Sequence, residues 1–152
     1  MGAAFVDTNR DFAGLFKLHQ EASIYIAELT AILKALGYTD LLRLPHIHIL
    51  TDSKSATLSL KCPSDKRKDP KEIHQITKTI EKLRERGITV RISWIPSHKG
   101  IAPNERADQM ANLARQIGRN MIQPLPPSAF FSKKLTPWRG QNGKQHGKLR
   151  ED

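Results

Sequence analysis

The sequence predicts a three-layer α/β fold with a mixed sheet, and two observations carry this prediction. Across the middle of the chain, short apolar runs alternate with segments whose apolar residues recur at helical spacing. Strands that alternate with helices form partly parallel sheets covered by helices. At 152 residues, the chain is long enough to bury the core of one such domain.

The first elements are expected to be a β-hairpin and a buried helix. Residues 2–7 and 12–18 are apolar runs separated by polar turn residues, which is typical of a hairpin. Residues 23–36 show helical spacing, Ser23 is a suitable N-cap, and Gly37 supplies the expected C-terminal stop. Because this helix is apolar nearly all round, we expect it to pack against the sheet.

The remaining elements alternate between strand and helix. In chain order they are a strand at 46–51, a short helix at 53–60, a basic connection at 61–70, a helix ended by Gly87, a strand at 89–95, and a helix from Pro103 to near Gly118. These elements define a domain at 2–118. Residues 119–152 are predicted to be a Pro-rich linker and a basic, aperiodic, disordered tail.

The overall charge favours a polyanion as partner. The chain has 25 Lys and Arg against 15 Asp and Glu, which gives a net charge of +10. Basic residues placed on phosphates release counterions and so favour nucleic-acid binding. Cys62 is the only cysteine, which excludes an internal disulfide and indicates an intracellular location, with nucleus or cytoplasm left open. No apolar run is long enough to span a bilayer, so no membrane partner is expected.

Carboxylates stand at three separated places where metal-assisted phosphodiester chemistry needs them. Glu28 is the one acid in an otherwise apolar helix, Asp52 closes an apolar strand, and Asp108 lies in the last predicted helix. Burying an ionised Glu28 without a partner would cost several kcal/mol, so a cation or hydrogen-bond network should be near it. His98, in a glycine-containing loop, could shuttle protons. Oxygen ligands of this kind suit Mg²⁺.

Other polar residues admit two interpretations each. Asn104 could cap the last helix or orient the preceding loop, and Ser53 and its neighbour Ser55 could bind phosphate or cap a helix. His46 and His48 are spaced like a metal pair, although alternate residues on a solvated strand face explain them better.

The order of these residues resembles type 1 ribonuclease H, in particular the ribonuclease H domains of non-LTR retrotransposon polyproteins. The matching segments are 2–6, 26–29, 49–53 and 94–108, and the likeness covers about residues 2–116. The resemblance implies an endonuclease that cuts the RNA strand of RNA–DNA hybrids with two Mg²⁺ ions, Mn²⁺ being an alternative. It also implies that Glu28, Asp52 and Asp108 are metal ligands and that His98 assists catalysis.

The resemblance also implies that the first strand of the family and its aspartate are absent. The chain matches the family from the second strand onward, and Asp7, the nearest acid, stands at the wrong end of its strand. We therefore expect an N-terminally truncated copy. A strand of about 5–6 residues contributes ladder hydrogen bonds of ~1 kcal/mol each and buried side chains of ~1.5–3 kcal/mol each. Without it, the neighbouring strands should leave a gap or pair in an altered way.

Two functions from different classes follow. The first is an RNA–DNA hybrid ribonuclease by family resemblance, with little cleavage expected of this chain alone. The alternative is a non-catalytic nucleic-acid-binding remnant of a retrotransposon polyprotein, with a reverse transcriptase segment of the same polyprotein as a further partner. In either case, the residues expected to contact nucleic acid are Ser53, Lys66, Arg67, Lys68, Lys99 and Asn104.

Overall fold

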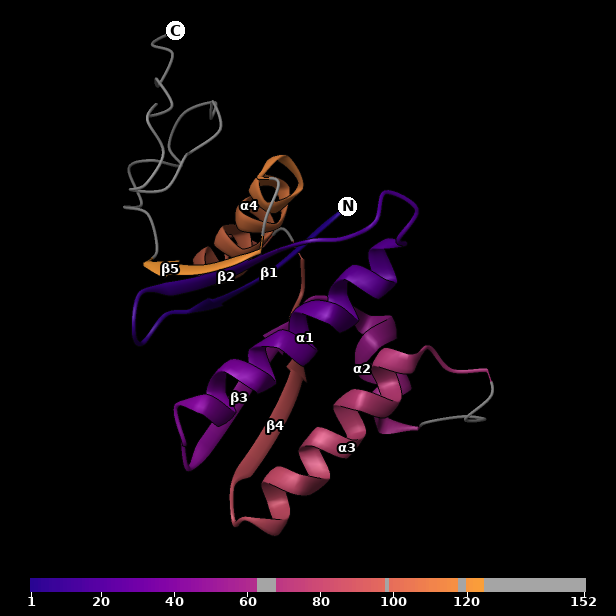
Figure 1. Ribbon diagram of the computed structural model, residues 1–152, viewed down its shortest axis with the longest axis vertical. Helices are drawn as coiled ribbons and strands as arrows, with labels where there is room; N and C mark the ends of the chain where they lie inside the picture. The colour runs from indigo at the N-terminus through magenta and orange to yellow at the C-terminus, as the bar shows by residue number, and fades with distance from the viewer. Residues whose placement is uncertain (63–67, 98, 118–119, 125–152) are drawn as a thin grey trace, which may run out of the picture.

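The computed structural model describes residues 1–62, 68–97, 99–117 and 120–124. It is an α/β structure, as predicted, in which helices pack against two groups of strands (Figure 1). The elements in chain order are β1 (Gly2–Asp7), β2 (Phe12–Lys17), α1 (Ile24–Leu41), β3 (His46–Thr51), α2 (Lys54–Lys61), α3 (Lys71–Glu85), β4 (Thr89–Trp94), α4 (Ala102–Gln116) and β5 (Met121–Pro124).

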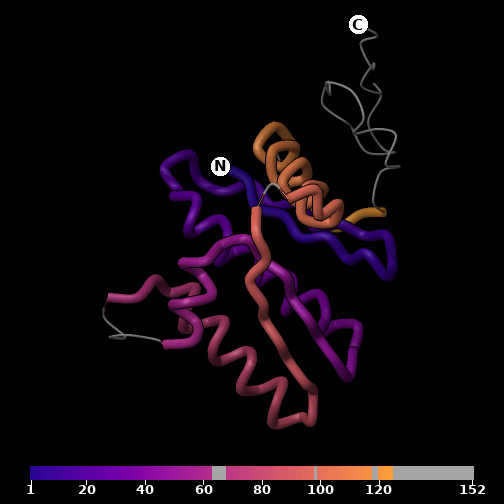
Figure 2. Tube along the Cα trace, turned by 180° about the vertical axis from the view of Figure 1, so that it is seen from behind, coloured from indigo at the N-terminus to yellow at the C-terminus, as the bar shows by residue number. Residues whose placement is uncertain are grey.

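The strands form two separate sheets rather than one. β1, β2 and β5 form an antiparallel sheet in the order β1-β2-β5, and β3 pairs in parallel with β4. Among the described residues, no ladder joins β1 to β3. The sequence left a gap or an altered pairing open at this place, and the structure has the gap. Seen from behind, β3 and β4 run side by side and apart from the hairpin strands (Figure 2).

Helices divide the molecule into two halves that share α1. The hairpin half consists of β1, β2, β5 and α4, and α4 packs on β1 and β2. The parallel half consists of β3, β4, α2 and α3. Helix α1 lies between them, with Ala27 and Ala35 in the cluster of the hairpin sheet and Leu29, Ile32 and Leu36 in the core of the parallel half. This two-sided burial confirms the apolar helix expected from the sequence.

The end of α1 differs from the prediction. The helix continues through Gly37 to Leu41 instead of stopping at Gly37. A glycine inside a helix costs only about 1 kcal/mol relative to alanine. The packing of the residues around it outweighs that cost: Leu36 is fully buried and Tyr38 packs against Phe5.

The folded part also extends beyond the expected boundary at residue 118. Met121–Pro124 form β5, which pairs antiparallel with β2, whereas the sequence indicated a linker there. The neighbouring backbone is tied down as well, because Lys17 N donates to Asn120 Oδ1 at 2.9 Å. The strand escaped prediction because it is short and ends in Pro124, which is tolerated at the margin of a sheet. The predicted disordered tail at 125–152 lies outside the described residues.

The other helices begin where the sequence indicates. Ser53 caps α2 by accepting from Ala56 N, and α4 has Pro103 in its first turn. After α3, Gly87 adopts a φ of 79°, a left-handed conformation that glycine takes without strain. Within the described ranges, no helix is both long and apolar enough to cross a membrane.

Candidate active site

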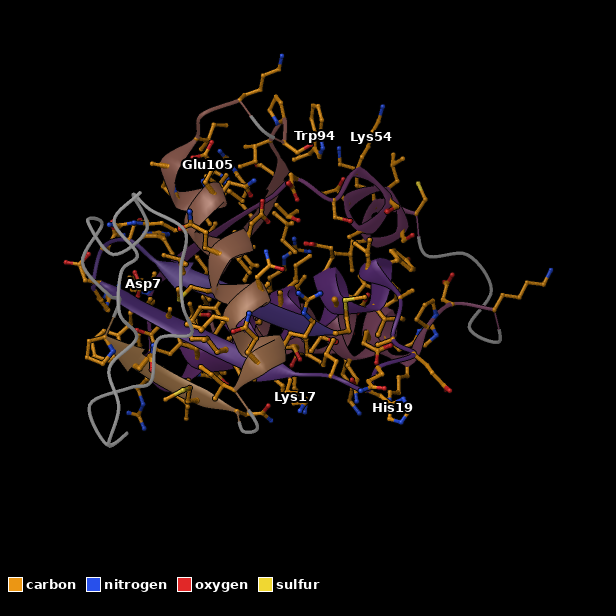
Figure 3. All side chains as sticks on the ribbon, turned by 90° about the horizontal axis from the view of Figure 1, so that it is seen from above. Asp7, Lys17, His19, Lys54, Trp94 and Glu105 are labelled. Carbon is orange, nitrogen blue, oxygen red and sulfur yellow. The ribbon has the colours of Figure 1, made fainter. Side chains whose placement is uncertain are left out.

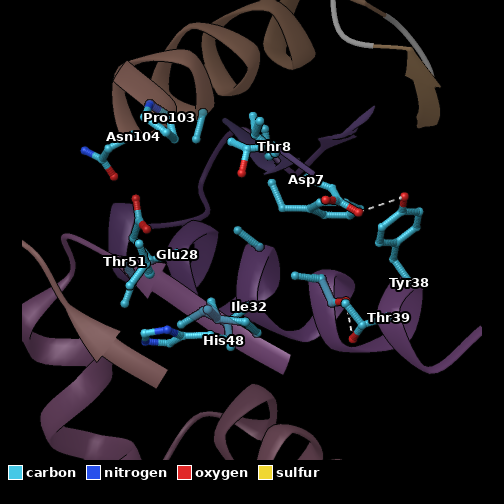
Figure 4. Close-up of a pocket in the computed structure, with 18 of the residues that line it drawn as sticks. Asp7, Thr8, Glu28, Ile32, Tyr38, Thr39, His48, Thr51, Pro103 and Asn104 are labelled. Atoms are coloured by element: carbon cyan, nitrogen blue, oxygen red, sulfur yellow. Dashed lines mark hydrogen bonds between the residues drawn. The ribbon is translucent and has the colours of Figure 1, made fainter. Parts of the chain in front are cut away.

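A cavity of about 300 Å³ lies between the two halves of the molecule. Its walls come from β1, β3, α1 and the start of α4 (Figure 4). One end is polar and contains the carboxylates singled out in the sequence. At the other end of the cavity, Tyr38 Oη donates to Asp7 Oδ2 at 3.2 Å, and Asp7 lies away from Glu28.

Three of the predicted catalytic residues line this one cavity. Glu28 comes from the second turn of α1, Asp52 follows β3, and Asp108 lies in α4. Asn104 Nδ2 donates to Asp52 Oδ2 at 3.1 Å and so links α4 to the end of β3. Figure 4 shows Glu28 pointing from α1 toward the side of the cavity where Asn104 lies. The fold therefore brings together acids that are up to 80 positions apart in the sequence (108 − 28).

The three acids influence one another electrostatically. Burial and, to a smaller extent, the nearby charges of Asp52 and Asp108 together raise the pKa of Glu28 from 4.5 to about 7. Near neutral pH, Glu28 is therefore only partly ionised. A raised pKa of this origin is typical of a functional pocket, because an isolated surface glutamate keeps its ordinary pKa.

The carboxylate oxygens at this end of the cavity are of the chemical type that binds a hard divalent cation. Carboxylate oxygens are what Mg²⁺ prefers, and a cation would relieve the repulsion among Glu28, Asp52 and Asp108. Among the described residues, however, no three side chains of His, Cys, Asp or Glu are close enough together to hold one metal ion. In this arrangement a single ion could take at most two of these carboxylates directly. The site is acidic and oxygen-rich but not closed around an ion.

The remaining predicted residues divide into those that the structure describes and those outside the described part. Asn104 orients Asp52 rather than capping α4, whose N-cap is Ile101. Ser53 caps α2 beside Asp52, and Lys68 and Lys99 are exposed. His98, Lys66 and Arg67 lie outside the described residues. Glu105 is exposed on α4 and does not line the cavity, although it shares a helix face with Asp108 in sequence spacing.

The two histidines of β3 lie on the exposed face of that strand. His46 and His48 are both exposed, and His48 Nε2 lies 2.9 Å from Ser93 Oγ on the neighbouring β4. Their alternation with buried Ile47 follows the period of a strand.

Trp94 lies at the site, although the sequence analysis assigned it no function. Its indole Nε1 donates to the Asp52 carbonyl oxygen at 3.0 Å, while 47% of the residue stays exposed. In Figure 3, Trp94 and Lys54 project from the same margin of the molecule, and Glu105 lies on α4. An aromatic residue at the end of a strand, directly before the loop that carries His98, was the available signal. An exposed ring beside an acidic pocket can stack on a nucleic-acid base.

The fold and these carboxylates define a class: an α/β domain with an acidic pocket at the carboxyl end of a parallel strand, as nucleases have. The profile of the RNase H family matches residues 1–116. The chain therefore belongs to the RNase H family, whose members act on RNA–DNA hybrids and generally use divalent metals.

Solved structures support the fold. The chain is similar to the N-terminal RNase H domain of a Mycobacterium tuberculosis protein, solved as a fusion with maltose-binding protein. The TM-score is 0.51 at 18% identity, and the match covers 76% of this chain and 90% of that one. It is also similar to RNase H1 of the halophilic archaeon Halobacterium salinarum, with a TM-score of 0.50 at 19% identity over 76% of this chain and 94% of that one. No curated protein sequence matches significantly.

Proposed function

We propose that this chain is an RNA–DNA hybrid ribonuclease of type 1, which cleaves the RNA strand endonucleolytically. The observation that supports the proposal best is the convergence of Glu28, Asp52 and Asp108 on one cavity, with Asn104 holding Asp52. The family match over residues 1–116 supports the same reaction class.

Each residue has a role in this proposal. Glu28, Asp52 and Asp108 would hold two Mg²⁺ ions, and such ions would supply charge stabilisation at the scissile phosphate and a more acidic water molecule. Asn104 keeps the Asp52 carboxylate turned toward the cavity. His98 exchanges a proton with the product. Near neutral pH, Glu28 must lose its proton to serve as a ligand, so metal binding should release protons.

Exposed basic residues and a polar residue beside Asp52 would hold the nucleic-acid backbone. We assign this role to Lys68 and Lys99, both exposed, and to Ser53 beside Asp52. Lys66 and Arg67 extend the same basic connection in the sequence. The domain proposed for this task runs from residue 2 through β5.

The wider context is proposed from the resemblance in the sequence. A retrotransposon polyprotein with a reverse transcriptase segment would supply RNA–DNA hybrids as substrate. The gap between β1 and β3 supports the idea that the active form includes a further strand beside them.

The test is cleavage of a labelled RNA–DNA hybrid by the purified chain with Mg²⁺ and, separately, Mn²⁺. Cleavage that Asp52→Asn abolishes and Glu105→Gln leaves unchanged supports the proposal, because Glu105 is an exposed acid outside the cavity. Cleavage that survives Asp52→Asn contradicts the assignment of the site.

A non-catalytic nucleic-acid-binding role is the second candidate. The observation that favours it is the spacing of the acids, since no described group of three is close enough to hold one ion. Hybrid binding that weakens steeply with salt, without cleavage at any metal concentration, would select this role.

A further inference from the structure

A second, smaller pocket of about 240 Å³ lies in the parallel half, between β4, α2 and α3. Three half-buried aliphatic residues line it, one from each of these elements: Leu60, Ile80 and Ile92. Each packs against the core of the parallel half and stays partly exposed. Pockets that hold drug-sized ligands have about 300–1,000 Å³, so this one suits a single large apolar side chain.

The pocket lies beside a free strand edge. Among the described strands, β4 pairs with β3 alone. The N–H groups of Thr89 and Ile95 donate to carbonyl oxygens at the two ends of β3, at 3.0 and 2.9 Å. Because successive residues of a strand turn their N–H and C=O groups to opposite edges, those of Val90 and Ile92 point to the free edge. The same two residues line the pocket, so pocket and edge form one surface.

Two basic residues belong to the lining of this pocket. Lys61 lies in the last turn of α2 and Arg84 in the last turn of α3, and both are exposed. Figure 1 shows α2 beside the carboxyl end of β4 and the end of α3 beside its start, so the two charges lie toward opposite ends of the pocket. No ion pair joins either one to another described residue. Acidic groups on both sides of an apolar residue would complement these charges.

The lining of the pocket favours a peptide over a nucleic acid as occupant. None of the described residues that line it has an aromatic ring on which a base could stack. In an extended peptide, residues two positions apart point to the same face. An apolar residue can therefore enter the pocket while acids two positions before and after it point toward Lys61 and Arg84.

We propose that the β4 edge site, formed by this pocket and the free edge of Thr89–Trp94, binds an extended acidic segment of a partner protein. The segment has an acid, a leucine-sized apolar residue and a second acid at alternate positions. It adds to β4 through main-chain hydrogen bonds, its apolar side chain fills the pocket, and its carboxylates contact Lys61 and Arg84. Main-chain bonds give the affinity in this mode of recognition, and the side-chain pocket gives the specificity. The proposal does not depend on the proposed nuclease activity.

The probe is a fluorescent synthetic peptide with the core aspartate-threonine-leucine-threonine-aspartate and a glycine-serine stretch at each end. Binding to the full chain is measured by fluorescence anisotropy, and amide hydrogen exchange is followed in β4 and in β1 in the same samples. We expect binding together with slower exchange at Val90 and Ile92, because their N–H groups gain acceptors on the free edge. Exchange in β1, which also has a free edge, should not change.

Two matched peptides test what the β4 edge site recognises. Replacing the leucine of the peptide by alanine leaves the pocket mostly unfilled, and we expect binding at least tenfold weaker, on the order of 1.4 kcal/mol. Replacing both aspartates by asparagines keeps the shape and removes the charges, and we expect binding about fivefold weaker.

Two matched variants test the location. Arg84→Glu reverses a charge at the pocket and should weaken binding of the acidic peptide about fivefold. A peptide with lysines in place of the aspartates should bind Arg84→Glu more tightly than it binds the unaltered chain. Lys82→Glu makes the same change of charge at an exposed position of α3 outside the pocket and should alter neither result. Circular dichroism confirms that each variant is folded, and the peptide comparisons on the unaltered chain decide if Arg84→Glu is not.

Four results would overturn the proposal. Equal binding of the alanine peptide excludes the apolar pocket, and an equal effect of Lys82→Glu would mean attraction to the net charge alone. Slower exchange in β1 instead of β4 would place the peptide on another strand edge. Displacement of the peptide by an RNA–DNA hybrid whose own binding requires Arg84 would assign the surface to nucleic acid.

Discussion

The hairpin half and the parallel half of this molecule both bury large side chains, but among the described glycines only Gly2 of the hairpin half brings a strand and a helix into close backbone contact. In the hairpin half, the buried sheet positions include Ala4 and Ala13, and a Cβ atom added at Gly2 would overlap the carbonyl oxygen of Ala111 in α4. In the parallel half, the fully buried side chains are large aliphatic ones such as Ile76. The hairpin half buries large side chains too, Leu15 and Met110 among them, so close approach of the backbones at Gly2 is added there to ordinary side-chain packing.

The comparison shows what depends on α1. That helix is the element whose buried residues belong to both clusters, and it also carries Glu28 between Asp52 of the parallel half and Asp108 of the hairpin half. The site is therefore assembled only while both halves stay packed on the same helix. The following predictions test this dependence, from the largest expected effect to the smallest.

Truncating one large core residue in each half should cost the most. Leu83→Ala in α3 and Met110→Ala in α4 each remove a fully buried side chain, and we expect each to lower the free energy of unfolding by about 2–5 kcal/mol. Urea denaturation measures the loss, with Leu41→Ala at an exposed position as control. If α1 couples the halves, amide exchange should rise in both halves for either variant. A rise confined to the mutated half would show that the halves open separately.

Neutralising Glu28 should stabilise the fold in a pH-dependent way. The pKa of Glu28 is about 7 in the folded chain against 4.5 as the ordinary value, so ionisation favours the unfolded state as pH rises between these values. We expect Glu28→Gln to be near neutral at about pH 4 and to stabilise by up to about 3 kcal/mol at about pH 8. Urea midpoints at both pH values measure this. Glu105→Gln is the control, and a gain for Glu28→Gln that is equal at both pH values would contradict the assignment.

Glycine substitutions should show how much the close backbone contact of β1 with α4 matters for stability. Gly2→Val adds side-chain atoms where β1 meets α4, and we expect a loss of about 1–3 kcal/mol. Gly37→Ala in α1 adds a methyl group where nothing lies within 4 Å, and we expect a gain of about 0.5–1 kcal/mol. Thermal unfolding compares them. Two variants of equal stability would mean that close approach in the hairpin half is not required.

Two tyrosines on α1 allow a matched test of the hydrogen bonds that join this helix to each half. Tyr38 Oη donates to Asp7 in the hairpin half, and Tyr25 Oη donates to Ser59 in the parallel half at 2.8 Å. Each exchange to phenylalanine should cost about 0.5–1.5 kcal/mol. The double variant should lose the sum, because the two bonds share no partner. A strongly non-additive result would reveal that one attachment fails when the other is removed.

The acids of the site could be predicted because each is a local anomaly. Glu28 is the one charged acid among apolar helix residues, and Asp52 directly follows an apolar strand. Their convergence with Asp108 follows from topology, since the carboxyl end of a strand is where sites form in α/β sheets. The hydrogen bonds of Asn104 and Trp94 to Asp52 could not be predicted, because they join residues more than 40 positions apart.

Other differences come from packing that overrides local preference. Gly37 favours a helix end in isolation, yet α1 continues because its next turn is packed against Phe5. β5 has too few residues to carry a strand pattern of its own and forms because β2 offers it an edge. Two separate sheets were one of two outcomes that the sequence allowed, since local patterns do not specify which edges meet.

The double burial of α1 makes its length a fixed property of the molecule. Inserting one residue into an α-helix turns everything beyond it by about 100° and advances it by 1.5 Å. An insertion between Glu28 and Ala35 would rotate the later alanine face away from the hairpin sheet while the earlier turn stayed in place. Insertions and deletions in homologous chains should therefore fall in the loops, and the number of residues in α1 should stay constant.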